Sequence, residues 1–287
     1  MKRKLTPPLP DLAQTQPGLS ILRLASLLAE DAPDVDEEAL DLMFEQVDAG
    51  LLLDTEPAKI WPELARGLMA RSPSKMLKTL RECGALEHIL PEVAALFGVP
   101  QMTDDPTPVD LGEHLLKALD EAARRDAPLA VRFALLVMNV GKGDSPPEHL
   151  PVHYRHVERG RPRIKAICAR FETPVDCQEL ALMALVECER VHRASKARAG
   201  PVAHMLERVG AFRAPEFYQL FLTVCACDYC ANGDRSGADY PKADLLNAAL
   251  AACAGLDGAA HDDAVQIARA EAIARVFNSQ RWSDGAA

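Results

Sequence analysis

Apolar side chains recur at helical spacing from Leu19 almost to the C-terminus. In the stretch LSILRLASLLAE, residues 19–30, leucine, isoleucine and alanine lie three and four positions apart, which is the pattern of a helix with one buried face. Runs of alternating β-branched residues, which a half-buried strand requires, are absent from the chain. The sequence therefore predicts an all-α fold.

Changes in composition divide the chain into parts. The first 16 residues are rich in proline, and a polar, proline-bearing stretch, PQMTDDPTPVDLGEH, separates two helical regions. We therefore expect a flexible lead-in at 1–16, a helical domain at 17–100, a linker at 101–111, a second helical domain at 112–235 and C-terminal helices packed on it at 236–287. Beyond the linker, helices are expected at about 112–126, 128–140, 154–171, 175–192, 201–209, 214–231, 240–253 and 262–278.

The composition is that of a soluble globular protein, with 48% apolar and 26% charged residues. No run reaches the roughly 18 apolar residues of a membrane span, and the N-terminus lacks the apolar stretch of a signal peptide. We therefore expect a cytoplasmic protein with no membrane partner. The scattered cysteines fit that compartment as reduced thiols. Cys225, Cys227 and Cys230 in CACDYC are expected to be core thiols, because positions i and i+2 of a helix point to different faces.

Net charge restricts the binding of nucleic acid. The chain carries −10 at pH 7, whereas proteins that bind a phosphate backbone usually present a basic surface. Two segments, RHVERGRPRIK and RVHRASKAR, concentrate arginine and lysine, and arginine clusters bind phosphate by bidentate hydrogen bonds. Their basic residues are either an anion- or RNA-binding groove or a solvated, charge-balanced surface: Arg155, Arg159, Arg161, Arg163, Lys165, Arg190, Arg193, Lys196 and Arg198.

Several long stretches resemble the bacterial CCA-adding enzymes, the tRNA nucleotidyltransferases. They are ILRLASLLAED, KIWPELARGLMARSPSKMLKTLRECGALEHILPEVAALFGVPQ, PLAVRFALLVMNVGKG, LPVHYRHVERG and ADYPKADLLNAALAA, in the order of that family. The resemblance implies that 17–100 corresponds to the helical neck and body and 112–235 to an HD-type phosphohydrolase domain. It also implies that tRNA or another RNA is the partner.

The residues that carry nucleotidyl transfer in that family have no counterpart here. The catalytic head, with its paired metal-binding aspartates, has no matching segment before residue 16, and two carboxylates are needed to hold the metal ions. Where the family's neck pairs an aspartate and an arginine with the incoming base, this sequence aligns Pro17 and Ser20. We expect no nucleotidyl transfer and a catalytically silent, headless relative.

The HD motif is also altered. By resemblance, the adjacent His-Asp pair that would bridge the metal ions falls on Met138 and Asn139. A thioether is a poor ligand for Mg²⁺ or Mn²⁺, and an amide oxygen carries no charge. Met138 is therefore expected to be a core side chain. The remaining family positions correspond to His114, His153, His156 and Asp228, with His192 nearby.

Three functions are therefore compared. The first is a silent helical scaffold that binds tRNA, another RNA or a phosphate-bearing ligand, with no cofactor. The second is a residual phosphohydrolase of the 2′,3′-cyclic phosphodiesterase or phosphatase type. It would hold one Ni²⁺, Mn²⁺ or Mg²⁺ ion at His114, His153, His156 and Asp228. The third is a protein-interaction module that docks on a separate subunit or forms a homodimer.

Overall fold

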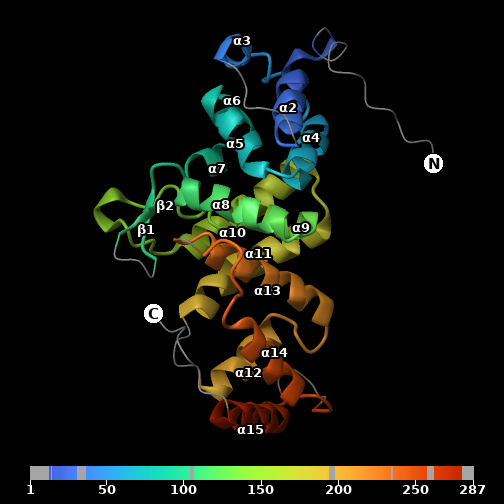
Figure 1. The fold of residues 1–287 in the computed structure, drawn as a ribbon, viewed down its shortest axis with the longest axis vertical. Coiled ribbons are helices and arrows are strands. Elements are labelled where there is room, and N and C mark those ends of the chain that lie inside the picture. The colour runs from blue at the N-terminus through green and yellow to red at the C-terminus, as the bar shows by residue number, and fades with distance from the viewer. Residues whose placement is uncertain are drawn as a thin grey trace, which may run out of the picture.

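In the computed structural model, the helices stack along one long axis (Figure 1). Helices from the first third of the chain lie at one end, and α12, α14 and α15 lie at the other. The structure describes residues 13, 15–30, 37–103, 107–193, 198–233, 235–256 and 262–279. Most of the proline-rich lead-in, together with Lys196, lies outside these residues.

Helices account for nearly all the regular structure of the described residues, so the predicted all-α fold is confirmed. Their bounds are α2 (Pro17–Leu28), α3 (Glu37–Asp48), α4 (Pro57–Met69), α5 (Pro73–Glu82), α6 (Ala85–Ile89), α7 (Pro91–Ala94), α8 (Leu111–Arg124), α9 (Leu129–Val137), α10 (His156–Phe171), α11 (Val175–Arg193), α12 (Ala199–Arg208), α13 (Pro215–Cys230), α14 (Ala243–Ala252) and α15 (Asp263–Ser279), with a 3₁₀ turn η1 at Pro147–His149. The helices expected after residue 111 agree with these bounds to within three residues. No helix among the described residues is long and apolar enough to span a membrane.

The connector between the two helical regions contains a short strand pair that has no signal in the sequence. Strand β1 (Pro100–Gln101) pairs antiparallel with β2 (Val109–Asp110). Two-residue strands are too short to show an alternating pattern. The Asp110 side chain then accepts a hydrogen bond of 2.9 Å from the Glu113 backbone N–H and caps α8. The pairing holds Gln101 beside the second helical region, while the division into domains stays a prediction.

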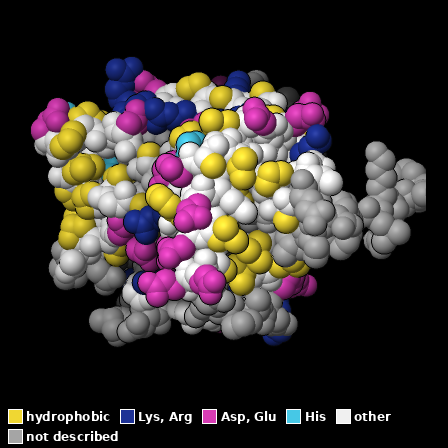
Figure 2. Space-filling view, turned by 90° about the horizontal axis from the view of Figure 1, so that it is seen from above, with side chains coloured by type: hydrophobic (Ala, Val, Ile, Leu, Met, Phe, Trp, Pro, Cys, Tyr) yellow, Lys and Arg dark blue, Asp and Glu magenta, His cyan; other side chains and the backbone are white. Residues whose placement is uncertain are grey.

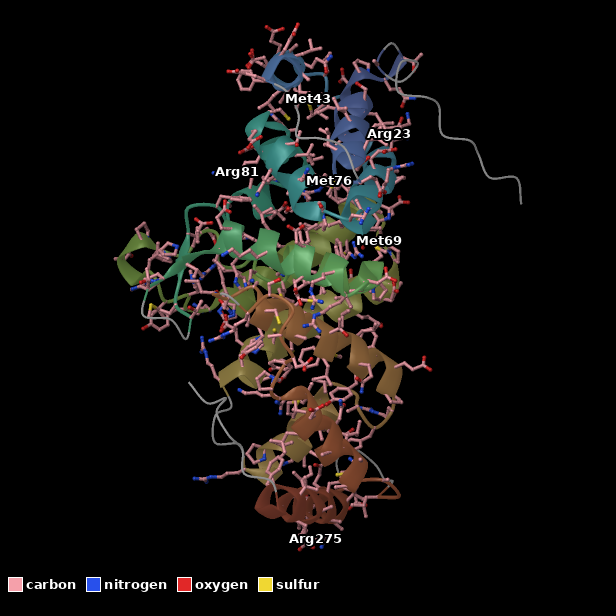
Figure 3. All side chains as sticks on the ribbon, viewed as in Figure 1. Arg23, Met43, Met69, Met76, Arg81 and Arg275 are labelled. Atoms are coloured by element: carbon pink, nitrogen blue, oxygen red, sulfur yellow. The ribbon has the colours of Figure 1, made fainter. Side chains whose placement is uncertain are left out.

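Buried arginines join the helices. Arg132 of α9 donates to the carbonyl oxygens of Leu68 and Ala70 at 2.8 and 2.9 Å, where α4 ends and its carbonyls lack partners. In the first region, Arg23 of α2 and Glu63 of α4 form a bidentate pair at 2.5 and 2.6 Å. Both side chains are less than 10% exposed, and Figure 3 labels Arg23 on α2. The charge of Glu63 is therefore neutralised inside the fold.

Candidate functional site

A close backbone approach shapes the region where α9 ends. A Cβ atom on Gly141 would lie 2.0 Å from the carbonyl oxygen of His156 and 2.6 Å from the backbone N of Gly160. Because these distances are far shorter than any contact between non-bonded atoms, only glycine at this position allows α10 to pack against the loop after α9. The loop is thereby held in place, with Asn139 before Gly141 and Lys142 after it.

A pocket opens beside this loop. It has a volume of about 30 Å³, which is enough for a water molecule or an ion, because one water needs about 10–15 Å³. Helices α10, α11 and α13, the segment directly after α9 and strand β1 all contribute to its wall. The lining residues are Gln101, Met138, Asn139, Lys142, His156, Ala184, Leu185, Cys188, Glu189 and Asp228.

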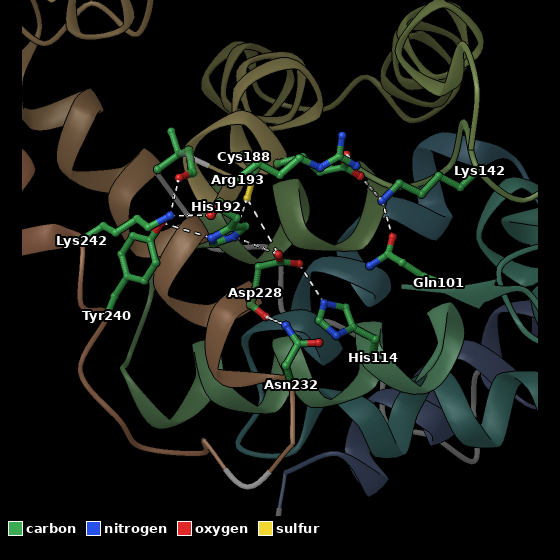
Figure 4. A network of polar contacts seen from close by, with 12 residues as sticks. Gln101, His114, Lys142, Cys188, His192, Arg193, Asp228, Asn232, Tyr240 and Lys242 are labelled. Carbon is green, nitrogen blue, oxygen red and sulfur yellow. Dashed lines mark hydrogen bonds and ion pairs between the residues drawn. The ribbon is translucent and has the colours of Figure 1, made fainter. Parts of the chain in front are cut away.

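On one side of the pocket, two histidines and a cysteine surround Asp228 of α13 (Figure 4). His114 Nε2 of α8 donates to Asp228 Oδ1 at 2.8 Å. On the other carboxylate oxygen, His192 Nε2 lies 3.1 Å from Oδ2, and Cys188 Sγ lies 4.0 Å from it. Cys188 Sγ is also 3.4 Å from His192 Nε2. We call Cys188, His192 and Asp228 the Asp228 cluster.

The pKa values of the Asp228 cluster move in different directions. Burial raises the pKa of Asp228, but His114 and His192 lower it by more, so the carboxyl group stays ionised. Burial lowers the pKa of His192, but Cys188 and Asp228 raise it to about 10. The hydrogen bond with Cys225 and burial raise the pKa of the Cys188 thiol well above its usual value. The Asp228 carboxylate thus sits beside an imidazole and a thiol whose pKa values are both raised.

The opposite side of the pocket holds a buried lysine. Lys142 is 2% exposed, and its ammonium group lies 2.5 Å from Glu189 Oε1 and donates to Gln101 Oε1. Glu189 also accepts from Arg193 at 2.8 Å, and His156 Nε2 lies 3.8 Å from its Oε1. We call Lys142 and Glu189 the Lys142 pair. In it, a cation that is part of the chain neutralises the carboxylate.

The positive charge of Lys142 affects the neighbouring histidines. Burial and Lys142 lower the pKa of His153 to about 4, and the same two causes lower the pKa of His156. Burial raises the pKa of Glu189, whereas Lys142 lowers it by more. His153 Nδ1 lies 2.8 Å from Ser145 Oγ, and His156 Nδ1 lies 2.9 Å from the carbonyl oxygen of His153. Both histidines therefore stay neutral.

The four residues expected to share one ion are divided between the two sides. His114 and Asp228 are in contact, whereas His153 and His156 make their hydrogen bonds beside the Lys142 pair. Met138 is 5% exposed and packs in the core, as expected, and Asn139 lies next to it. Cys225, Cys227 and Cys230 are buried free thiols.

Sequence reasoning missed several residues of the pocket. The sequence patterns did not point to Cys188, Glu189 or Lys142 as residues of a site. The spacing of Cys188 and His192, four residues apart on one helix face, is the signal that was available. The contact of Gln101 with Lys142 joins residues 41 positions apart, and no local pattern indicates it.

Most of the predicted phosphate-binding arginines are in ion pairs. Arg163 holds Asp144 at 2.5 and 2.7 Å, and Arg159 donates to Asp144 and to the carbonyl oxygen of Gly141. These two arginines fasten the loop after α9. Arg155 pairs with Glu158, Arg190 with Glu187 and Arg193 with Glu189. Arg161, Lys165 and Arg198 are exposed.

Residues 34–97 match a family described as the probable RNA- and SrmB-binding site of polymerase A. The matched segment covers α3 to α7. It therefore lies wholly in the first helical region, away from the pocket between α9, α11 and α13.

Curated relatives match most of the chain. A multifunctional CCA protein of Chromobacterium violaceum is 42% identical over 240 residues, which are 84% of this chain and 59% of the relative. The protein of the same name from Nitrosospira multiformis is 39% identical, and the match covers 86% of this chain and 60% of the relative. That of Halorhodospira halophila is also 39% identical, with 90% of this chain and 65% of the relative covered. The chain spans about three fifths of the length of these relatives, and it belongs to the CCA-adding enzyme family.

Proposed function

We propose that this chain is an RNA-binding helical scaffold and that an RNA of the tRNA type is its partner. The match of residues 34–97 to a family described as RNA-binding supports this proposal, as do relatives named multifunctional CCA proteins. The single observation on which it rests is the charge of α4 and α5, which differs in sign from that of the whole chain.

Residues 57–82 hold six lysines and arginines and two glutamates, in a chain whose net charge is −10. One of the two acids, Glu63, is buried and paired with Arg23, so it adds no negative charge to the surface. The segment therefore presents a local basic surface of the kind that releases counterions from a phosphate backbone. This surface lies inside the segment matched by the RNA-binding family.

The basic side chains of α5 lie on one side of the helix. Lys75, Lys78 and Arg81 follow each other at intervals of three residues, which keeps them on neighbouring positions of the helix surface. Lys78 and Arg81 are exposed, and the Arg81 guanidinium lies 4.4 Å from the centre of the Phe97 ring. Figure 3 labels Arg81 on the outer side of α5. An aromatic ring beside a cation suits an RNA base next to a phosphate.

The end of the molecule at which α2 and α3 lie is less suited to RNA than the basic surface of α5. In Figure 2, which looks onto that end, acidic and apolar side chains occupy the middle of the face, and the largest group of Lys and Arg lies at its edge. Among the arginines and lysines expected from the sequence, Arg161 and Lys165 on the exposed side of α10 form the second surface of the proposal. The other described arginines of that set, except Arg198, already have a carboxylate partner.

We further propose that residues 112–235 form a degenerate HD-type domain without hydrolytic activity. Met138 and Asn139 provide no bridging carboxylate or imidazole, and the carboxylate beside His156, that of Glu189, is already paired with the ammonium group of Lys142. The proposal predicts no turnover of 2′,3′-cyclic phosphates or nucleotide monophosphates with Mg²⁺, Mn²⁺ or Ni²⁺. Turnover that disappears in His114→Ala would support the hydrolase instead.

Filter binding of tRNA at several salt concentrations tests the RNA proposal. With four or more phosphate contacts, log K falls by at least about 3 units per decade of salt. Lys78→Gln with Arg81→Gln is expected to weaken binding and to reduce that slope by about 1.5 units. Lys117→Gln, an exposed lysine of α8, is the control and leaves both unchanged. Binding that does not depend on salt, or no binding at low salt, contradicts the proposal.

If Arg161→Gln with Lys165→Gln reduces the slope and the α5 variant does not, α10 rather than α5 carries the RNA surface. If neither double variant changes the slope, the proposed surfaces are both wrong. Circular dichroism of each variant checks that the helices are intact.

A further inference from the structure

We propose that Cys188, His192 and Asp228 form a mononuclear binding site for Zn²⁺. Among the described residues, these are the three His, Cys, Asp or Glu residues whose ligand atoms all lie within 4.8 Å of one another. The site is independent of the RNA-binding surface of α5. It also differs from the hard-metal set expected from the sequence, since Cys188 and His192 take the place of His114, His153 and His156 beside Asp228.

The distances between the three ligand atoms fit one tetrahedral ion. With zinc bonds of ordinary length, a tetrahedron places N and S about 3.6 Å apart, N and O about 3.4 Å, and S and O about 3.6 Å. The structure has 3.4 Å from Cys188 Sγ to His192 Nε2, 3.1 Å from that nitrogen to Asp228 Oδ2, and 4.0 Å from the sulfur to the same oxygen. Each edge is within 0.4 Å of the tetrahedral value.

The local structure aims these atoms at one point. Cys188 and His192 are four residues apart on α11, so their side chains lie one turn apart on the same face. Asp228 reaches them from α13. Lys242 donates to the carbonyl oxygens of Val191 at 3.0 Å and of His192, and this contact holds the last turn of α11.

Outer partners orient two of the three ligands. The Tyr240 hydroxyl lies 3.1 Å from His192 Nδ1, and an Nδ1–H donated to it leaves Nε2 as the ligand atom. His114 Nε2 donates to Asp228 Oδ1 at 2.8 Å, which leaves Oδ2 for the ion. Figure 4 shows both contacts. Hydrogen bonds of this kind accompany metal-binding histidines and carboxylates in proteins.

The donor set favours zinc over magnesium or manganese. A thiolate is a soft ligand, which Zn²⁺ accepts and Mg²⁺ does not. A thiolate and a carboxylate together balance the charge of a divalent ion. Lys142 does not oppose this charge balance, because Glu189 already neutralises the charge of the Lys142 ammonium group. Cys188 and Asp228 both line the pocket, so a water molecule there can complete the fourth position.

Metal titration of the full chain tests the site. The chain stripped by a chelator is expected to bind one Zn²⁺ at micromolar concentration, measured by competition with a chromophoric chelator. Co²⁺ in place of Zn²⁺ is expected to show a thiolate-to-metal charge-transfer band. Cys188→Ser removes that band, whereas Cys168→Ser, which changes a buried thiol outside the cluster, leaves it intact.

His192→Ala is expected to lower Zn²⁺ affinity by about 100-fold or more, because even outer partners of a metal site contribute about 10–100-fold. Tyr240→Phe, which keeps the ring, is expected to lower it by about 10-fold. No zinc uptake by the folded chain, or a wild-type Co²⁺ spectrum without the thiolate band, overturns the proposal even if Cys188→Ser does not fold. The α5 variants are expected to bind Zn²⁺ normally, so failure of one proposal leaves the other open to its own test.

Discussion

Asp228 and Glu189 both bring a carboxylate to the same pocket, from α13 and α11, but their partners differ. Glu189 pairs with the ammonium of Lys142, a cation that is covalently part of the chain and cannot leave. Asp228 pairs with two imidazoles beside a thiol. These are groups that exchange a proton for a metal ion.

A carboxylate in a pocket does not by itself make a metal site. What matters is whether the positive charge beside it is exchangeable. The Lys142 pair is neutral without any ligand, whereas the Asp228 cluster offers three convergent donor atoms. Substitutions at these residues and their neighbours test this contrast.

Lys142→Met removes the internal cation and leaves Glu189 without its ammonium partner. We expect a loss of about 3 kcal/mol in the free energy of unfolding, because breaking a buried ion pair from one side typically costs about 3–5 kcal/mol. The lower value applies because Glu189 is 29% exposed and keeps its contact with Arg193. Urea unfolding measures the loss. Adding Glu189→Gln to the same chain is expected to recover part of it, and equal losses in the single and double variants would show that the ion pair is not the cause.

His114→Leu removes the hydrogen-bond donor of Asp228 Oδ1. We expect a loss of about 2 kcal/mol, because a hydrogen bond to a charged group contributes about 1.5–3 kcal/mol. His114→Gln, whose amide N–H can still donate, is expected to lose less. If the two variants unfold at the same urea concentration, the hydrogen bond to Asp228 adds nothing to the free energy of unfolding beyond the packing of the side chain.

His153→Gln tests the electrostatic effect of the Lys142 pair through pH. The pKa of His153 is about 4 in the folded chain and about 6.5 when unfolded, so below about pH 6.5 the unfolded chain binds a proton that the folded chain does not. The wild type therefore loses stability from this group as pH falls toward 4. The difference in unfolding free energy between wild type and variant is expected to shrink from pH 7 to pH 5. A constant difference would contradict the lowered pKa.

Arg163→Gln loosens the loop that carries Lys142, because it removes the bidentate contact with Asp144. Asp144 is half exposed, so the expected loss is about 1 kcal/mol, at the upper end for surface ion pairs. Arg161→Gln on the same helix is the matched control, with an expected change under about 0.5 kcal/mol. Thermal unfolding compares the two variants. Equal shifts in Tm would show that the contact of Arg163 with Asp144 does not stabilise the loop.

Local patterns predicted the helices well because each depends on neighbours in the sequence. The stripe in residues 19–30 and the apolar run before Met138 are examples, since burial of one face follows directly from spacing. The sequence also predicts, by resemblance, that Met138 and Asn139 stand where a His-Asp pair would bridge metal ions, and this prediction needs no fold because side-chain chemistry is a local property. The strand pair at Gln101 could not be predicted, because a strand of two residues is too short to show an alternating pattern of apolar and polar residues.

The functional assignment of the charged residues was less predictable. Clustered arginines such as Arg159 and Arg163 favour a phosphate site in the sequence, and the structure adds that both pair with Asp144, while phosphate binding by them stays a prediction. A sequence shows how many charges are close along the chain. It does not show which opposite charges the fold brings to them.

The sequence alone was enough to predict that the chain is helical and that it resembles the CCA-adding enzymes, and by that resemblance to expect Met138 and Asn139 where a His-Asp pair would bridge metal ions. Spacing and side-chain chemistry are local properties, so they can be read before folding. Only the tertiary structure decided which carboxylate meets a lysine and which meets histidines and a thiol. His114 and Asp228 are 114 positions apart, and the packing of α8, α11 and α13 alone makes them neighbours.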